Sequence, residues 1–198
     1  NDLLAKQRHN SFGKTEMWYL VQADSDARLI VGFKEEMSQS SYLQNLVNKT
    51  LLATLDEIKV QQGDVFLIET GTIHAIGAGT VIAEIQQTSD ITYRLYDFDR
   101  VDSDGNLREL HVDLALDAIN YNTVSSQRQH QKNRNQSNPV VDCPYFTTQF
   151  IPLDGQLNVL KTGATFTVYM CVDGQFEIVL DEQHYSYSKG DTILVPAV

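Results

Sequence analysis

Residues 63–77 read GDVFLIETGTIHAIG, and this is the most informative stretch of the sequence. Gly63 and Asp64 form a turn before Val65–Ile68, a short apolar run that is typical of a strand. Gly71 and Gly77, which favour turns, then stand on the two sides of His74. A histidine that follows a strand and a turn, with small residues beside it, can point into the mouth of a barrel. The alternative is a structural histidine, so at this point His74 is a candidate metal ligand only.

The rest of the chain repeats this pattern of short strands. Runs rich in β-branched and aromatic residues predict strands at Met17–Gln22, Leu29–Phe33, Val81–Gln86, Thr92–Tyr96, Phe146–Phe150, Phe166–Val172, Phe176–Leu180 and Thr192–Val195. Apolar residues at helical spacing predict two helices, at Ser41–Leu55 and from about His111 to Asn120. Many short strands with frequent turns favour an antiparallel barrel or sandwich, so we expect a mainly β protein with a few short helices.

The opening stretch has an echo near the end of the sequence. Gly63–Ile68 (GDVFLI) resembles Gly190–Val195 (GDTILV), because in each a Gly-Asp pair leads into an apolar strand. Between them, Thr123–Asn138 has almost no apolar residues and is expected to be an exposed linker or a long loop. Two related barrels in tandem would explain the echo.

The amino-acid composition limits the kinds of molecule that this protein is expected to bind. The 198 residues include 15 Lys and Arg against 26 Asp and Glu, and a net charge of −11 would repel a phosphate backbone. We therefore expect no nucleic-acid partner, although one local cationic pocket could still bind a small anion. No membrane-spanning run and no signal peptide are visible, so we expect no membrane association. Cys143 and Cys171 form no CxxC pair, and two reduced thiols are typical of a cytoplasmic protein.

The segment GKTEMWY holds a second set of candidate residues. On a strand, Lys14, Glu16 and Trp18 share one face. A Lys and a Glu on an inward face would be costly to bury without partners. A metal ion would satisfy the carboxylate and a bound anion would satisfy the ammonium. The alternative is a pair on an edge that faces solvent.

Two predicted strands further along carry polar residues on one face each. Glu84 and Gln86 share a face of the first strand, and Thr92, Arg94 and Tyr96 share a face of the second. Polar faces on adjacent barrel strands indicate a wet interior that could hold a ligand. An exposed outer face of the sheet is the alternative.

Four segments together resemble class I mannose-6-phosphate isomerases of the short bacterial type: Gly13–Tyr19 (GKTEMWY), Gly63–Gly77 (GDVFLIETGTIHAIG), Ala83–Arg100 (AEIQQTSDITYRLYDFDR) and Asp104–Leu116 (DGNLRELHVDLAL). Their order and approximate spacing agree with that family over most of the chain. The resemblance implies a zinc-dependent cupin enzyme, with one divalent ion per active site. It also implies the small-molecule partners, because the family interconverts mannose 6-phosphate and fructose 6-phosphate.

The resemblance implies a role for each matching residue. The expected metal ligands are Glu16 and His74, the expected catalytic residue is Arg94, and the expected substrate-pocket residues are Lys14, Glu84 and Asp90. Family members also carry a QVHP-type motif whose histidine is a further zinc ligand. That motif would lie immediately upstream of Asn1. We therefore expect this chain to be truncated at both ends.

On this resemblance the expected fold is a tandem cupin β-barrel or jelly roll. Residues 1–122 are expected to form a catalytic cupin domain with a helical insertion, 123–140 a linker, and 141–198 a second, incomplete cupin-like domain.

The first functional hypothesis is aldose–ketose isomerisation by proton transfer through an enediol, with Glu84, Lys14 or a metal-bound water as the base. The alternative is a non-catalytic cupin module that binds a sugar or a metal. An oxygenase ranks last, because it would need a second histidine. The sequence leaves the oligomeric state open.

Overall fold

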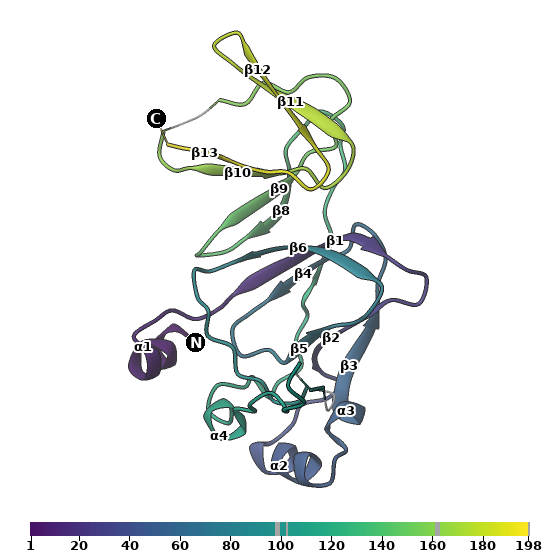
Figure 1. Ribbon diagram of the computed structural model, residues 1–198, viewed down its shortest axis with the longest axis vertical. Helices are drawn as coiled ribbons and strands as arrows, with labels where there is room; N and C mark the ends of the chain where they lie inside the picture. Colours follow the sequence, from purple (N-terminus) through teal and green to yellow (C-terminus); the bar gives the residue numbers. More distant parts are fainter. Residues whose placement is uncertain (98–99, 102, 161–162, 198) are drawn as a thin grey trace.

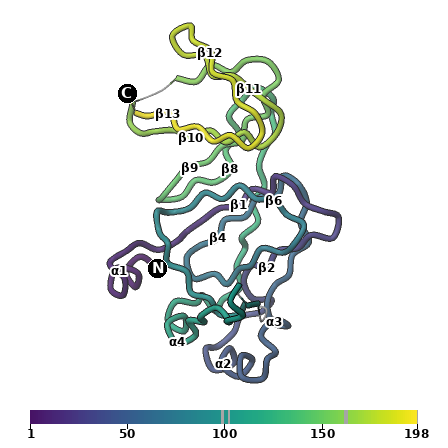
Figure 2. The backbone as a smooth tube through the Cα atoms, viewed as in Figure 1, coloured from purple at the N-terminus to yellow at the C-terminus, as the bar shows by residue number. Residues whose placement is uncertain are grey.

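The computed structural model describes residues 1–97, 100–101, 103–160 and 163–197, which form two lobes stacked along the long axis (Figures 1 and 2). Strands dominate, which confirms the mainly β prediction. The elements are α1 (Asp2–His9), β1 (Glu16–Ala23), β2 (Arg28–Phe33), α2 (Gln39–Val47), α3 (Leu51–Thr54), β3 (Leu55–Lys59), β4 (Val65–Ile68), β5 (His74–Ile76), β6 (Thr80–Gln86), α4 (Val112–Ala115), β7 (Gln127–Arg128), β8 (Asn138–Asp142), β9 (Thr147–Phe150), β10 (Thr167–Met170), β11 (Gln175–Leu180), β12 (Gln183–Ser188) and β13 (Thr192–Val195).

Two antiparallel sheets build the first lobe, one in the order β6-β1-β4-β7 and the other in the order β3-β2-β5. Successive side chains of a strand point to opposite faces, so alternate apolar residues gather in one core. The buried members of this core are Trp18, Leu20, Ala27, Leu29, Val31, Val60, Phe66 and Ile68. Glu16 is two residues before Trp18 on β1, and the same alternation turns its side chain toward this interior.

Strand β1 is covered on both faces. On the outer face, Met17 and Val65 pack against Val141 of β8. Tyr19 also stacks on Phe150 of β9, with ring centroids 5.5 Å apart. A strand that is buried on both faces is expected to be almost continuously apolar, which is how MWYLV reads. The first two strands of the second lobe, β8 and β9, therefore pack on the outer face of the larger sheet of the first lobe.

The sequence echo is also an echo of structure. In each copy, the glycine of the Gly-Asp turn has a positive φ, and its N–H donates to a residue that lies in the neighbouring strand or directly after it. The same residue donates its own N–H to the carbonyl of the aspartate. The bonds are Gly63 N to Leu20 O (2.8 Å) and Leu20 N to Asp64 O (2.9 Å), then Gly190 N to Cys171 O and Cys171 N to Asp191 O (both 2.9 Å). The same Gly-Asp turn, followed by a strand and held by the same pair of backbone hydrogen bonds, therefore occurs once in each lobe.

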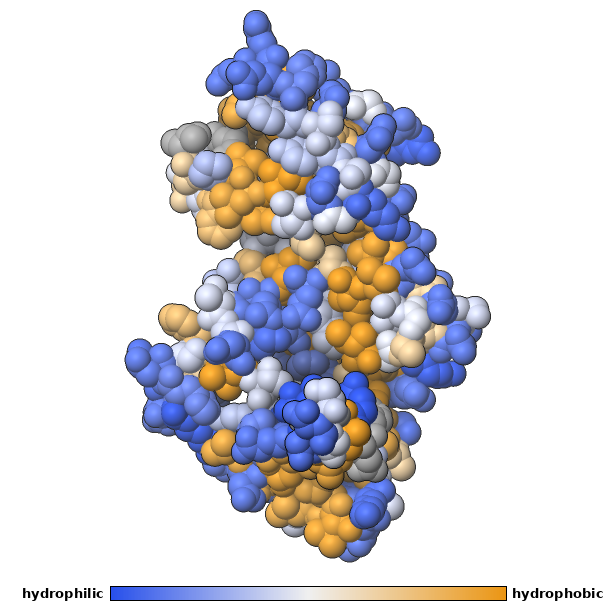
Figure 3. Space-filling view, viewed as in Figure 1, coloured by the Kyte–Doolittle hydropathy of each residue, from blue (hydrophilic) through white to orange (hydrophobic). Residues whose placement is uncertain are grey.

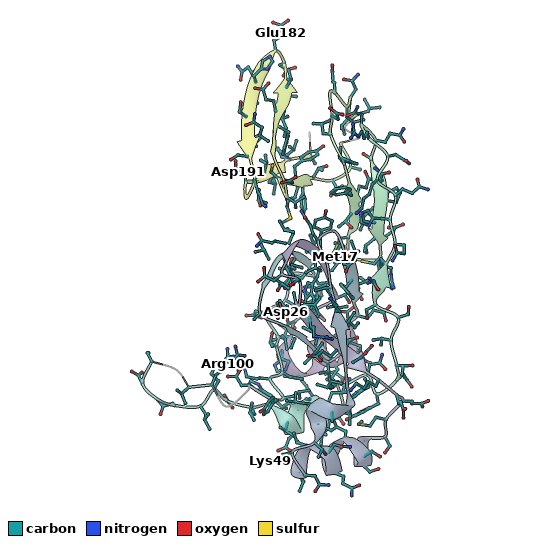
Figure 4. The ribbon with its side chains drawn as sticks, turned by 90° about the vertical axis from the view of Figure 1, so that its right-hand side faces the viewer. Met17, Asp26, Lys49, Arg100, Glu182 and Asp191 are labelled. Atoms are coloured by element: carbon teal, nitrogen blue, oxygen red, sulfur yellow. The ribbon has the colours of Figure 1, made fainter. Side chains whose placement is uncertain are left out.

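The second lobe is less completely packed than the first. Within the part of this lobe that the structure describes, the strands form three separate pairs, β8-β9, β10-β13 and β11-β12, which are not joined into a larger sheet. Glu182 marks the tip of the β11-β12 hairpin, which stands away from the rest of the molecule, and Asp191 marks the start of β13 (Figure 4). Large apolar side chains consequently stay between 44% and 61% exposed on Phe166, Val168, Val179, Leu180 and Leu194. Figure 3 shows a large apolar area on this lobe.

The helical predictions were only partly right. The stretch predicted as one helix, Ser41–Leu55, forms α2 and the short α3, because Lys49 between them adopts a left-handed φ of 59°. Only Val112–Ala115 of the second predicted helix is α-helical. The N-terminal helix α1 was not predicted; its first turn is capped by the side chain of Asn1. Among the helices in the described ranges, none has the length and apolar character that crossing a bilayer demands.

The polar stretch predicted as an exposed linker contains paired residues. Gln127 and Arg128 form β7 against Phe66 and Val65 of β4. Asn138, only 2% exposed, begins β8. These residues pair through their backbone, which local composition does not reveal. The division into domains at 1–122, 123–140 and 141–198 stays a prediction.

Candidate active site

The two sheets of the first lobe bring Glu16 and His74 together in a polar cluster, in which Glu16 is buried and His74 and Lys14 are partly open to solvent. Glu16, from the start of β1, is fully buried. His74, from the start of β5 on the other sheet, places its Nε2 atom 2.9 Å from Oε1 of Glu16. The ammonium of Lys14 lies 2.5 Å from the second oxygen, Oε2. The structure thus brings together three of the residues that the sequence singled out.

The turn before His74 explains how that side chain reaches the site. Gly71 has a φ of 98°, and a Cβ atom there would lie 2.4 Å from the carbonyl oxygen of Ala118. Only glycine allows this close approach, in which the Gly71 carbonyl accepts a hydrogen bond from Asn120 N at 2.9 Å. The next residue, Thr72, is buried, and its carbonyl lies 2.8 Å from Nδ1 of His74. The imidazole is therefore oriented by the backbone of its own turn.

Burial by itself raises the pKa of Glu16. The hydrogen bonds and charges of His74 and Lys14 outweigh that effect, and the pKa of the carboxyl lies below its usual range. Glu16 is therefore an ionised carboxylate in the interior of the lobe. Such a group needs partners on both oxygens, since an unpaired buried charge is strongly unfavourable.

The contacts of His74 fit a metal ligand. Nδ1 donates to the carbonyl of Thr72, which leaves Nε2 to face the Glu16 carboxylate. Nε2 lies 2.9 Å from Oε1 of Glu16, a fully buried atom, so a proton or a cation must stand between the two atoms. Metal-binding histidines usually hold their other nitrogen on a carbonyl or carboxylate in this way.

Glu16 and His74 supply two donors of such a site. Catalytic zinc usually has three protein ligands and a water. Within the described ranges, no group of three His, Cys, Asp or Glu side chains gathers at one point. The donor types fit zinc, and the described residues provide an incomplete set of ligands.

Two further side chains close a ring of contacts around Glu16. Oε1 of Glu84 lies 3.5 Å from Nζ of Lys14, and Oε2 of Glu84 accepts a hydrogen bond from the indole N–H of Trp18 at 3.1 Å. The ring of Trp18 in turn contacts the ring of His74, with centroids 5.3 Å apart and planes at 81°. We call these five residues, Lys14, Glu16, Trp18, His74 and Glu84, the Glu16 network. The sequence placed Trp18 on the right face but gave no sign of its contact with Glu84.

The structure does not join Arg94 or Asp90 to the Glu16 network through any contact among the described residues. The predicted strand at Thr92–Tyr96 is absent. The backbone N–H of Arg94 instead donates to Nδ1 of the His111 side chain at 3.1 Å, and the carbonyl of Arg94 accepts from the backbone N–H of His111 at 2.7 Å. Its guanidinium donates to the carbonyl of Glu109 at 3.2 Å. Arg94 therefore lies against residues 109–111. Asp90 is exposed just after β6.

Comparison with known proteins agrees with these observations. The family described as mannose-6-phosphate isomerase, cupin domain, matches residues 136–198. Mannose-6-phosphate isomerase ManA of Bacillus subtilis is 33% identical over 99% of this chain, and a mannose-6-phosphate isomerase of Streptococcus mutans is 32% identical over 97%. The chain spans 63% and 61% of the length of these two relatives.

Solved structures give the same answer. The crystal structure of mannose 6-phosphate isomerase from Bacillus subtilis superposes on this chain with a TM-score of 0.89 at 27% identity. The superposition covers 100% of this chain and 63% of the Bacillus subtilis chain. A phosphomannose isomerase variant from Salmonella typhimurium shares the fold, with a TM-score of 0.71 at 12% identity over 99% of this chain and 68% of its own. The chain is therefore similar to mannose-6-phosphate isomerases along nearly its whole length, and its fold is the cupin fold of the Bacillus subtilis enzyme.

Proposed function

We propose that this chain carries the site of a zinc-dependent aldose–ketose isomerase that interconverts mannose 6-phosphate and fructose 6-phosphate. The observation that supports this most directly is the 2.9 Å approach of His74 Nε2 to the buried Glu16 carboxylate, with Lys14 on its other oxygen. It is energetically unfavourable to place a carboxylate, an imidazole and an ammonium together in a protein core. The same three groups are suited to binding a metal ion and a sugar. The names of the relatives supply the substrate class.

The reaction moves a proton between C1 and C2 of the sugar through an enediol, so it needs a base and a way to stabilise negative charge on oxygen. A bound zinc ion would polarise the sugar oxygens as a Lewis acid. Glu16 and His74 are the residues that would hold it. Glu84 is the best-placed base in the Glu16 network, since its carboxylate is about a third exposed and is fixed at one oxygen by Trp18.

The two candidate cations have different surroundings. Lys14 lies between the carboxylates of Glu16 and Glu84, so much of its charge is already neutralised, and it is suited to hold a sugar hydroxyl. The guanidinium of Arg94 donates to a neutral carbonyl, and no carboxylate among the described residues forms an ion pair with it. Arg94 is therefore the better candidate to meet the phosphate or the enediolate.

Activity with and without metal tests the proposal. The purified protein should convert mannose 6-phosphate to fructose 6-phosphate, lose this activity in chelator, and regain it with Zn²⁺. Arg94→Ala should lower turnover about 100- to 1000-fold, as expected for a group that stabilises developing charge. Arg134→Ala is the matched control, because Arg134 pairs with Asp154 on the surface of the second lobe.

Two outcomes would contradict the proposal. Normal turnover by Arg94→Ala would remove the catalytic role of Arg94. Stoichiometric binding of Zn²⁺ by wild-type protein without any turnover would favour the alternative, a cupin module that binds a metal or a sugar. The incomplete set of two metal donors among the described residues is the observation that keeps this alternative in view.

A further inference from the structure

We propose that Trp18 is a positioning residue of the isomerase site, which aims the Glu84 carboxylate through its indole N–H and restrains the His74 ring by direct contact. This inference rests on the proposed function and deepens it. It assigns a task to a side chain that would otherwise count only as core.

The first argument is burial. Trp18 is 1% exposed, so water cannot satisfy its indole N–H. An indole nitrogen is a donor only, and a buried donor without an acceptor is destabilising. Oε2 of Glu84, at 3.1 Å, is that acceptor. A core position that required only volume would be filled at lower cost by a residue without a polar atom.

The second argument is register. Trp18 and Glu84 are directly opposite each other in the β1-β6 pair. Both side chains therefore project from a rigid backbone into the same space, and neither depends on a loop for its position. A contact between paired strand residues can hold a carboxylate more precisely than a contact between loops.

The third argument is the consequence for the rest of the Glu16 network. Fixing Oε2 of Glu84 also directs Oε1, which lies 3.5 Å from the ammonium of Lys14. The nearly perpendicular Trp18–His74 contact limits rotation of the imidazole that faces Glu16. One side chain thus restrains the proposed base and a proposed metal ligand together.

Kinetics of single and double variants test the proposal. Trp18→Phe keeps an aromatic ring and loses the donor, and it should lower kcat about 10- to 100-fold with little change in KM. In a Glu84→Leu background the same change should lower kcat less than about twofold, because its target is gone. Phe33→Leu is the control: Phe33 is buried in the separate cluster with Tyr42 and Leu51, and its variant should lose stability without losing kcat.

Full activity of Trp18→Phe would overturn the proposal. The proposal would also be overturned if the fold-losses in kcat of the two single variants multiplied in the double variant, because multiplying losses are the mark of two residues that act independently.

A second measurement does not depend on turnover. Trp18 is the only tryptophan of the chain, so ¹⁵N labelling of the indole gives one assigned NMR cross-peak. Glu84→Leu should shift this peak, and Zn²⁺ alone, added to wild-type protein, should shift it as well. Glu177→Leu should leave it in place, because Glu177 pairs with His184 on the second lobe.

The two measurements separate the two proposals. An indole peak that ignores Glu84→Leu overturns the role of Trp18, whatever the activity. A peak that responds to Glu84→Leu and to Zn²⁺ in a protein without turnover overturns the isomerase, and it supports Trp18 as a positioning residue of a binding site.

Discussion

Removing the ammonium beside Glu16 should destabilise the metal-free protein by about 2 kcal/mol. Lys14→Met keeps a long apolar side chain and removes only the charge. Breaking a fully buried ion pair costs about 3–5 kcal/mol, and one charge-assisted hydrogen bond contributes about 1.5–3 kcal/mol. The Glu16 side chain is 1% exposed, whereas that of Lys14 is 23% exposed, so water can partly replace the ammonium and the lower range applies.

The assay is urea unfolding in chelator, followed by the fluorescence of Trp18. With a slope of about 2 kcal/mol per molar urea, the midpoint for Lys14→Met should fall by about 1 M. Lys34→Met is the control, since the ammonium of the exposed Lys34 donates to the carbonyl of Ala53 and forms no ion pair among the described residues, and it should change stability by less than about 0.5 kcal/mol.

A double variant sharpens this test. In a Glu16→Gln background the buried charge is absent, so Lys14→Met should cost less than about 1 kcal/mol. If Lys14→Met costs the same with Glu16 present or replaced, or matches the Lys34 control, then the ammonium does not stabilise the buried carboxylate and our reasoning about the site is refuted.

One further prediction concerns Asp2 at the start of α1, and one concerns Gly71 in the turn before His74. The hydrogen bond from Tyr145 holds the pKa of Asp2 below its usual 3.8. The Asp2 carboxylate therefore stabilises the fold above pH 3.8, and this stabilisation is lost as the pH falls through the lowered pKa. In a series of unfolding midpoints measured against pH, Asp2→Asn should therefore show a smaller loss of stability at acid pH than the wild-type protein. Gly71→Ala should lower stability by more than about 3 kcal/mol in thermal unfolding, because it adds a clash with Ala118 to a strained φ. Gly105→Ala, with a similar φ of 83° but open space around it, should cost only about 1 kcal/mol; equal losses would show that the clash is absent.

The strands could be predicted wherever local pattern was enough. Val65–Ile68 and Thr192–Val195 were predicted residue for residue, because a Gly-Asp turn marks where each begins and a short apolar run defines the rest. Thr92–Tyr96 shows the limit. Its β-branched and aromatic residues are typical of a strand, but a strand also needs a partner, and the backbone of Arg94 pairs with His111 instead.

The sequence by itself determined which side chains of the candidate site share a strand face. The period of two places Lys14, Glu16 and Trp18 together from their spacing alone, and the GTIHA turn marks His74 as a candidate metal ligand. The resemblance to a known family then suggested the chemistry.

Only the tertiary structure decided how these pieces meet. Glu16 and His74 come from different sheets, and their 2.9 Å approach depends on how the core between the sheets packs. The bond between Trp18 and Glu84 depends on the register of β1 against β6. Packing and register are set by contacts between residues far apart in the chain, and a spacing pattern records only the neighbours along one strand.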